Sequence, residues 1–593
     1  MRRVVLALLA LAILAPAAQA ATGTATGPVY DSKGRVIQAP FAPAVTPARL
    51  TEKRATAIFF GDDKVADWLD RYPKRDRVTD ATFQKDTRDW KVGIWWGTAG
   101  EVATGRVDDK TGDVTEAWTG PQVAWKMARG YSGAFGGRQI NSLPIWLGFC
   151  VLFLLGLGDL RRPLSVRNLD LVVLLSFSLS LWFFNRGDIF TAVPLAYPPM
   201  AYLLARMAWT VWRGGPRASR AVWPVWAIAA GAVFLTGFRL GLNLRDSNVI
   251  DVGYSGVIGA ERIVHGESPY GHMPREGKLK PCGRKDAEGE IRERIQTNGR
   301  CESANERGDT YGPVAYESYI PGYALFGWSG RWDDLPAAHA TAIAFDVLAL
   351  LGLFLLGRRF GGARLAASLP FAWAAYPFTQ YVSSSNTNDA IMPVFLVFGF
   401  WLVTSAFARG AFLALAGWAK FGALLLVPLW ASYPEARRFS GKAVFAGGFA
   451  LATLAAFSVL LLEPSPAHAA RLFWDRTFGW QVGRDSPFSI WGWGQYHAAG
   501  IPDLGFLQQV GIGLLVAGAI ACYFFPRRKT PLQLAALTGA LLIGFELTLT
   551  HWFYLYIPWF FPFVAFVVLA ARRRRVETLP AHDDPDREPV PAG

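Results

Sequence analysis

The chain has 593 residues, of which 52% are hydrophobic, and it includes 24 Trp and 41 Phe. Between positions 143 and 571, apolar runs of about 18 to 23 residues recur, each long enough to cross the hydrocarbon core of a bilayer, which excludes a soluble enzyme. The formal net charge is +14, but the basic residues gather in short segments between apolar runs. That pattern is typical of cytoplasmic loops in a membrane protein and argues against a nucleic-acid partner.

The first 20 residues, MRRVVLALLALAILAPAAQA, combine a basic start, a short apolar core and small residues at Ala18 and Ala20. These features predict a signal peptide over 1–20, and an uncleaved anchor helix is the alternative. Both interpretations place the polar residues that follow outside the cytoplasm.

A Pro-rich stretch over 21–48 predicts an extended linker. Residues 49–141 then predict a small extracytoplasmic α+β domain. Its helix is expected in ATAIFFGDDKVADWLDRYP, and its strands in DWKVGIWW and EVATGRVDDKTGDVTEAW, with a Lys-Thr-Gly turn. This pattern resembles small PepSY-type modules over a short stretch. It contains no evident nucleophile, metal cluster or phosphate loop, so we expect it to bind a ligand or to shield a site.

The charge pattern predicts an all-α polytopic membrane domain over 142–571, with about eleven spans and one re-entrant hairpin. Its external loops are expected at 244–335 and 463–505, and a disordered cytoplasmic tail at 572–593. The hairpin is AFLALAGWAKFGALLLVPLW. If this segment crossed the bilayer, the basic clusters that follow it would lie outside. Lys420, between two glycines at its centre, favours a hairpin around a polar cavity.

The chain has four cysteines. Cys282 and Cys301 share the loop 244–335, and an extracytoplasmic loop predicts a disulfide between them. Cys150 and Cys522 lie in apolar segments, where we expect them to be inert. Neither the cysteines nor the aspartates show a spacing typical of a metal site.

This topology places several charged and amide side chains at the extracytoplasmic boundary of the membrane. They are Asp251, the turn SSSNTND at 383–389, Arg476, Arg484, Asp485 and His551. An acid with several cations and amides at a bilayer boundary suits a reaction on a lipid-linked anion.

The stretch DVGYSGVIGAERIVHGESPYG, residues 251–271, resembles the first external loop of the glycosyltransferase C superfamily, and above all the polyprenyl-phosphate-mannose-dependent mannosyltransferases of family 87. Later segments resemble that family in the same order: DTYGPVAYESYIPGYALF, NTNDAIMPVFLVFGFWL, LALAGWAKFGALLLVPLW, DRTFGWQVGRDSPFSIWG and HWFYLYIPWFFP. The resemblance covers about residues 140–571. It implies a glycosyltransferase C fold in a bacterial-type plasma membrane, with the active site on the extracytoplasmic face.

The activity that this resemblance implies is transfer of a sugar, above all mannose, from a polyprenyl-phosphate donor to a hydroxyl of a glycan or glycolipid, with inversion and without a cofactor. Arabinosyl- and glucosyltransferases share the layout. A hydroxyl attacks the anomeric carbon efficiently only when a base takes up its proton, and Asp251 is the expected general base. It begins an expected surface helix, where the chain leaves the bilayer. Asp251 could instead cap that helix, and Asp246 is the alternative base.

The departing phosphate needs cations. The expected donor-phosphate ligands are His551, Arg476, Arg484 and Lys420. As alternatives, the histidine could be an interfacial anchor and the arginines solvated loop residues. The expected sugar or acceptor ligands are Asn386, Asn388, Asp389, Tyr254 and Asp485, although the residues of the 383–389 turn could simply cap the next helix. Arg239, Asp346 and Glu546 lie within apolar runs and could form structural pairs.

Two other functional classes fit a polytopic chain. A transporter or flippase of lipid-linked glycans should carry its ionisable groups near the midplane and often shows paired repeats. Here the ionisable groups concentrate in external loops, and no convincing repeat is evident. An inactive receptor that senses envelope ligands through its N-terminal domain is the third class. The sequence names neither the acceptor nor the oligomeric state.

Overall fold

The structure is a computed structural model that describes residues 29–30, 33, 36–38, 47–128, 133–214, 223–284, 291–330, 332, 334–434 and 439–570. The predicted signal peptide, the predicted tail and most of the predicted linker lie outside the described residues. The chain divides into two compact units, Met1–Thr51 and Glu52–Gly593. Of the first unit, the structure describes the short strands β1 (Val29–Tyr30) and β2 (Val36–Gln38), which pair antiparallel.

The second unit begins with a small α+β domain. Its elements are α2 (Glu52–Phe60), α3 (Asp63–Leu69), β3 (Arg77–Gln84), β4 (Asp89–Trp96), η1 (Gly97–Ala99), β5 (Glu101–Asp108), β6 (Val114–Thr119) and α4 (Pro121–Met127). The strands form one antiparallel sheet in the order β3-β4-β5-β6, with the expected turn at Gly112. The single helix predicted at the start is two helices, because Asp62 caps α3 through the backbone N–H of Val65. Strand β3 was not predicted, since its polar sequence RVTDATFQ lacks the apolar content of a typical strand.

This domain contacts the segments that connect the long apolar helices. The Gln122 side chain donates a 2.8 Å hydrogen bond to the carbonyl of Gly187, and Arg71 donates one of 2.9 Å to the carbonyl of Ala499. The Trp68 ring packs against Tyr496.

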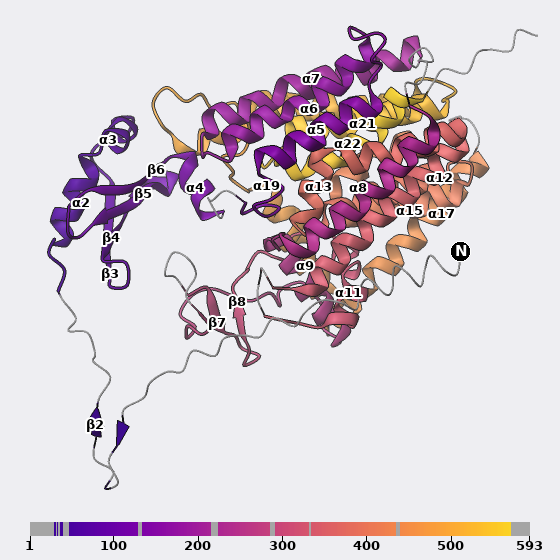
Figure 1. Cartoon of the computed structure of the whole chain (residues 1–593). Helices are drawn as coiled ribbons and strands as arrows, with labels where there is room; N and C mark the ends of the chain where they lie inside the picture. The colour runs from indigo at the N-terminus through magenta and orange to yellow at the C-terminus, as the bar shows by residue number, and fades with distance from the viewer. Residues whose placement is uncertain are drawn as a thin grey trace, which may run out of the picture. The chain divides into compact units, whose positions relative to one another are not determined.

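Long apolar helices make up most of the second unit and run beside one another in a bundle (Figure 1). They are α5 (Leu143–Leu157), α6 (Val166–Phe184), α7 (Ile189–Arg213), α8 (Val225–Arg245), α12 (Pro336–Ala375), α14 (Ile391–Trp401), α17 (Phe439–Ala456), α20 (Gly505–Phe524), α21 (Pro531–Thr548) and α22 (Ile557–Leu569). Within the described residues, six helical segments are long and apolar enough to cross a membrane, and shorter apolar helices accompany them. The protein is therefore a multi-pass membrane protein. Helix α12 is interrupted at Gly362 (φ 69°), where two helices meet at a kink.

The segment around Lys420 folds back on itself. It consists of α15 (Ala406–Ala419), the 3₁₀ helix η3 (Phe421–Leu426) and α16 (Val427–Ala431). Arg409, in the first turn of α15, donates hydrogen bonds to the carbonyls of Trp430 and Tyr433, at the far end of the segment. The two ends therefore meet, and Lys420 lies at the turn, as expected for a hairpin.

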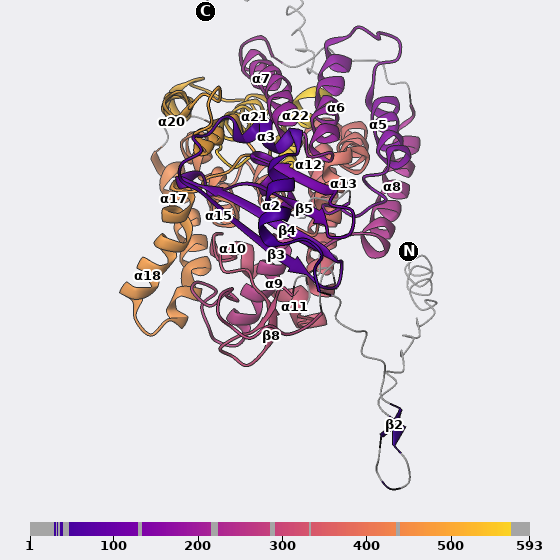
Figure 2. The same cartoon turned by 90° about the vertical axis from the view of Figure 1, so that its left-hand side faces the viewer.

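One end of the bundle carries α9 (Asp251–Val264), α10 (Pro313–Glu317), α11 (Ile320–Phe326) and the strand pair β7 (Glu293–Ile295) and β8 (Cys301–Ser303) (Figures 1 and 2). Cys282 and Cys301 are joined, which confirms the predicted disulfide. The expected helix is present as α9, and its residues 253–262 are buried within the protein. Neighbouring loops cover the helix. Arg262 of α9 forms ion pairs with Glu261 of the same helix and with Glu302 of β8.

The remaining elements connect these helices. They are α13 (Pro377–Ser384), η2 (Asn388–Ala390), η4 (Phe457–Leu462), α18 (Pro466–Trp474), the π-helical turn η5 (Asp475–Gly479), α19 (Trp480–Val482), η6 (Ile490–Tyr496) and η7 (Tyr554–Tyr556).

A buried ion pair fixes α8 against α12. Both carboxylate oxygens of Asp346 accept hydrogen bonds from Arg239, and the third guanidinium nitrogen donates to Thr379 at 3.1 Å. The indole of Trp373 also donates to Asp346, at 2.7 Å. The structural pairing suggested by the sequence is therefore present for Arg239 and Asp346. Glu546, the third charged residue within an apolar run, instead accepts a hydrogen bond from the indole of Trp552, at 3.0 Å.

Candidate functional site

The site begins where the turn after α13 meets the first turn of α9. Gly253 makes this approach possible, because a Cβ atom there would lie 2.1 Å from the carbonyl oxygen of Asn386. The backbone N–H groups of Asn248 and Ile250 donate to the carbonyls of Ser384 and Ser385 at 3.1 and 3.3 Å. Asp251 and Asp389 are therefore brought to the same region from distant parts of the chain.

A second close approach brings the loop before α10 against the hairpin. At Gly312, a Cβ atom would lie 2.0 Å from the carbonyl oxygen of Trp418. The preceding residue, Tyr311, consequently lies over the hairpin turn, with its ring centre 4.2 Å from Nζ of Lys420. A larger residue at position 312 would separate this loop from the hairpin.

Lys420 is the buried centre of the site. Its Nζ lies 3.0 Å from Oδ1 of Asp389, and both side chains are almost fully covered. The rings of Trp559 and Tyr556 lie 5.6 and 5.8 Å from the same nitrogen. Three aromatic rings and one carboxylate therefore surround the ammonium, and such rings attract a cation more strongly when water is excluded.

His551 and Arg484 form the next part of the site. Nη2 of Arg484 lies 3.4 Å from Nε2 of His551, and Oγ of Ser486 lies 2.8 Å from Nδ1. Because the guanidinium can only donate, the arrangement fits a neutral imidazole that accepts at Nε2 and donates from Nδ1 to the serine. Desolvation, followed by the charges of Arg484 and Lys420, holds the pKa of His551 well below its usual value. The imidazole is neutral in this state.

Asp251 lies at the exposed edge of the site as the first residue of α9. Its charge acts on Lys420, and desolvation together with that charge raises the pKa of Tyr311. The N-cap interpretation of Asp251 is wrong, because the N-cap residue is Ile250, which has no capping side chain. As a first-turn acid, Asp251 still interacts favourably with the helix dipole.

The alternative base, Asp246, is engaged elsewhere. Its Oδ2 accepts a 2.5 Å hydrogen bond from the backbone N–H of Gln139, in the segment that leads into α5. Next to it, Asn248 donates to the carbonyl of Ala134. These contacts fasten the segment between the small domain and the bundle.

The structure does not bring all predicted residues to the site. Arg476 donates to the buried Asp309 at 2.6 Å and to the carbonyl of Glu306, so it joins two loops.

The predicted sugar ligands also have partners within the protein. Asn386 forms hydrogen bonds with Asn243, Ser247 and Asn248. The hydroxyl of Tyr254 donates to the carbonyl of Ser303 and accepts from its N–H. Asp485 is exposed, and its charge acts on Tyr496 instead.

Several buried polar atoms around Lys420 have no hydrogen-bond partner among the described residues. They include Oδ1 of Asn388, Oε1 of Glu546 and Nε1 of Trp559. Buried polar atoms are nearly always satisfied in proteins, by protein groups or by ordered water. These two acceptors and one donor are therefore available to ordered water or to a polar ligand.

Sequence reasoning missed three aromatic residues of the site, Tyr311, Tyr556 and Trp559. Tyr556 and Trp559 are three residues apart at the start of α22, and their rings are stacked with their centres 4.3 Å apart. That spacing places two side chains on one helix face, which was the available signal. It was hidden among the many aromatic residues of the membrane domain.

Within the part of the chain that the structure describes, no group of three or more His, Cys, Asp or Glu side chains is arranged to hold a metal ion. The chain matches no protein-family model, no curated protein and no solved structure. Its chemistry must therefore be inferred from the site. Two cations and a neutral histidine lie near the exposed carboxylate of Asp251. Such a combination can bind an anion beside a proton acceptor.

Proposed function

We propose that the protein is a membrane glycosyltransferase of the glycosyltransferase C type. It transfers a sugar, with mannose as the expected sugar, from a polyprenyl-phosphate donor to a hydroxyl of an extracytoplasmic glycan or glycolipid. The observation that supports this most directly is the convergence of Lys420, Arg484 and His551 beside Asp251.

The cations suit the departing phosphate. When the bond between the anomeric carbon and the phosphate oxygen breaks, its electron pair stays on the phosphate, whose charge becomes more negative by one. Lys420 and Arg484 are fixed in a partly desolvated place, where cations stabilise developing negative charge more strongly than in water. The neutral His551 can also take up a proton from solvent as this charge develops, which would add a third positive charge beside the phosphate.

Asp251 suits the attacking hydroxyl. As the acceptor oxygen bonds to the anomeric carbon from the opposite face, its proton passes to the Asp251 carboxylate, and the configuration inverts. The acceptor approaches from water, while the polyprenyl tail of the donor remains in lipid. The exposed position of Asp251 suits the acceptor, and the buried cations beside it suit the donor phosphate. The unpaired polar atoms of Asn388, Glu546 and Trp559 can bind sugar hydroxyls.

The proposal includes a topology of about eleven spans in a bacterial-type plasma membrane, with the site on the extracytoplasmic face. The hairpin supports it, because a segment that turns back at Lys420 leaves the basic residues on both sides of it at one membrane face. A Val482→Cys protein should react with an impermeant thiol reagent in intact cells, since this side chain is 90% exposed. Arg528→Cys should react only after lysis, and the reverse pattern would contradict the topology.

The catalytic test is Asp251→Asn in the full-length protein. Membranes are incubated with radiolabelled polyprenyl-phosphate-mannose, and label is followed into products. The exchange keeps the size of the side chain but removes the proton acceptor, so transfer should fall by about 10²-fold or more. Donor binding and protein yield should stay near wild type.

Asp246→Asn is the matched control. Asparagine can still accept the hydrogen bond from Gln139, so transfer should stay near the wild-type rate. Wild-type turnover in Asp251→Asn would contradict the mechanism. Movement of the donor lipid without covalent transfer would instead identify a transporter or flippase. Parallel donors carrying glucose or arabinose determine the sugar.

A further inference from the structure

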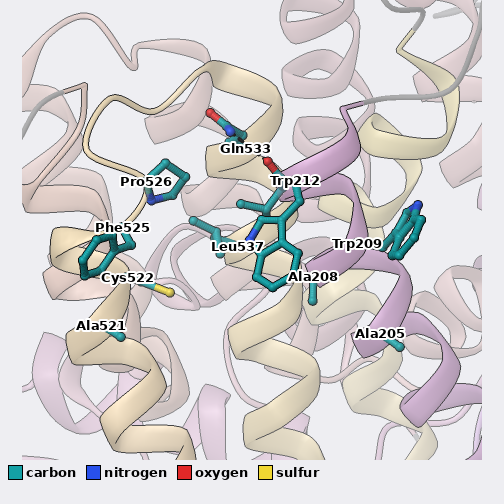
Figure 3. A pocket seen from close by; sticks show the side chains of 11 residues that line it. Ala205, Ala208, Trp209, Trp212, Ala521, Cys522, Phe525, Pro526, Gln533 and Leu537 are labelled. Carbon is teal, nitrogen blue, oxygen red and sulfur yellow. Dashed lines mark hydrogen bonds between the residues drawn. The ribbon is translucent and has the colours of Figure 1, made fainter.

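A cavity of about 720 Å³ lies between α7, α20 and α21 (Figure 3). It is lined by the C-terminal part of α7, the C-terminal part of α20 and the first residues of α21, including Trp209, Trp212, Cys522 and Leu537. Helix α21 separates this region from His551, which follows its other end at a distance of about 27 Å along the axis. The cavity is therefore distinct from the site around Lys420.

The lining is apolar in its chemistry. Gln533 is its one amide side chain, and both ends of that amide are engaged within the protein. Its Nε2 donates to the carbonyl of Val211 at 2.9 Å, and its Oε1 accepts from the backbone N–H of Thr530 at 3.0 Å. The other polar groups of the lining are the indole N–H groups of Trp209 and Trp212 and the thiol of Cys522, and all remaining lining side chains are apolar. A hydrocarbon chain therefore suits this cavity better than a polar solute.

The cavity lies at the periphery of the bundle, between exposed apolar side chains. Helix α20 lies at the edge of the bundle, beside α21 (Figure 2), and the structure buries only Ala519 among its residues. Trp212 is 88% exposed and Phe525 is 66% exposed. In a membrane, lipid covers such surfaces, so a lipid chain can enter the cavity from the side.

The segments that line the cavity carry basic residues and no acidic ones. Arg213 ends α7 with its guanidinium 5.1 Å from the ring centre of Trp209, and Arg527 and Arg528 are exposed directly after α20. No Asp or Glu occurs in residues 189–245 or 504–545, which include all three lining segments. Basic residues at the cytoplasmic ends of neighbouring membrane helices bind anionic lipid headgroups.

We propose that this cavity binds one anionic phospholipid of the cytoplasmic leaflet. A fatty-acyl chain occupies the space between α7, α20 and α21, and the phosphate lies among Arg213, Arg527 and Arg528. The lipid closes the gap left by the loosely packed α20. This site rests on the proposed topology, which puts these helix ends on the cytoplasmic side, but not on the proposed transferase activity.

Native mass spectrometry of the purified full-length protein tests the proposal. The protein is titrated with dioleoylphosphatidylglycerol or dioleoylphosphatidylcholine, which share acyl chains but differ in headgroup charge. The wild type should retain one phosphatidylglycerol with about 150-fold preference over phosphatidylcholine, as three basic side chains near an anionic headgroup would give at about 1 kcal/mol each. Arg527→Gln together with Arg528→Gln should remove most of this preference.

Two variants test the chain-binding part of the proposal. Ala521→Trp fills the cavity from an exposed position of α20, and Ala208→Phe fills it from α7, so neither disturbs a buried core residue. Both should abolish retention of the lipid. Val516→Trp is the matched control, because it adds the same ring about 140° around α20 and should leave retention unchanged. Equal retention of the two lipids by the wild type, or unchanged retention in both filled variants, would overturn the proposal.

Discussion

Two of the buried ion pairs in the membrane domain differ in how well their polar atoms are satisfied. The pair of Arg239 and Asp346 is fully engaged, because the guanidinium also donates to Thr379 and the carboxylate also accepts from Trp373. In the other pair, Lys420 contacts a single carboxylate, that of Asp389, and otherwise aromatic rings.

The surroundings of the two pairs differ as well. Around Lys420, buried atoms of Asn388, Glu546 and Trp559 have no hydrogen-bond partner among the described residues. A buried network with every group satisfied rigidifies a fold, whereas a partly satisfied one is costly unless a ligand completes it. We infer that the first pair holds α8 to α12 and that the second is organised for binding.

The largest expected effect is on stability. Arg239→Met leaves Asp346 buried without its cation, which should lower the free energy of unfolding by about 3–5 kcal/mol. Thermal unfolding of the purified protein in detergent measures this loss. Replacing the partner too, in Arg239→Met with Asp346→Leu, should recover most of the stability and keep transfer near wild type. A single variant as stable as the wild type would show that the pair does not hold these helices together.

The site pair should give the opposite result. Lys420→Met with Asp389→Asn removes both charges, while the amide introduced at position 389 can still interact with Thr387, so the free energy of unfolding should change by less than about 1 kcal/mol. Transfer should fall by about 10² to 10³-fold, as when one stabilising group is removed from an electrostatic site. Stability is measured as before, and transfer with the labelled donor. A double variant that keeps its turnover would show that Lys420 has no part in the reaction.

Much of the fold was predictable because hydrophobicity and charge act locally. The apolar runs predicted the membrane helices. Lys420 between two glycines predicted a re-entrant hairpin, and the contact between Arg409 and Tyr433 shows that this segment folds back on itself. The disulfide between Cys282 and Cys301 followed from the expected side of the membrane. By contrast, β3 was missed because its polar sequence becomes a strand only through pairing with β4.

The site was only partly predictable because its assembly depends on contacts between distant segments. The sequence indicated Asp251, Lys420, Arg484 and His551, which are types of residue that stand out at membrane boundaries. It did not show that Asp309 would engage Arg476, or that Gly312 would place Tyr311 over the lysine. Such close approaches depend on the absence of a side chain, which leaves no chemical signal in a single sequence.

The smallest expected effect concerns pH and the histidine of the site. His551 is neutral without a ligand, because desolvation and two nearby cations lower its pKa, and a bound phosphate should raise that pKa again. At a pH between the pKa of His551 in the free protein and its pKa in the complex, His551 takes up a proton when the phosphate binds. The affinity for a polyprenyl phosphate is therefore highest below the lower pKa and falls as pH rises, by at most about tenfold per pH unit. Binding titrations between pH 5.5 and 8 measure this slope.

His551→Gln provides the reference for that titration. Glutamine can replace the hydrogen bond with Ser486 but cannot titrate, whereas the phosphate itself still gains charge near pH 6 in both proteins. Subtracting the slope of the variant from that of the wild type therefore isolates the histidine. A remaining decrease in wild-type affinity with rising pH places His551 against the bound phosphate. Equal slopes in the two proteins would place the phosphate elsewhere and leave Lys420 and Arg484 to bind it without the histidine.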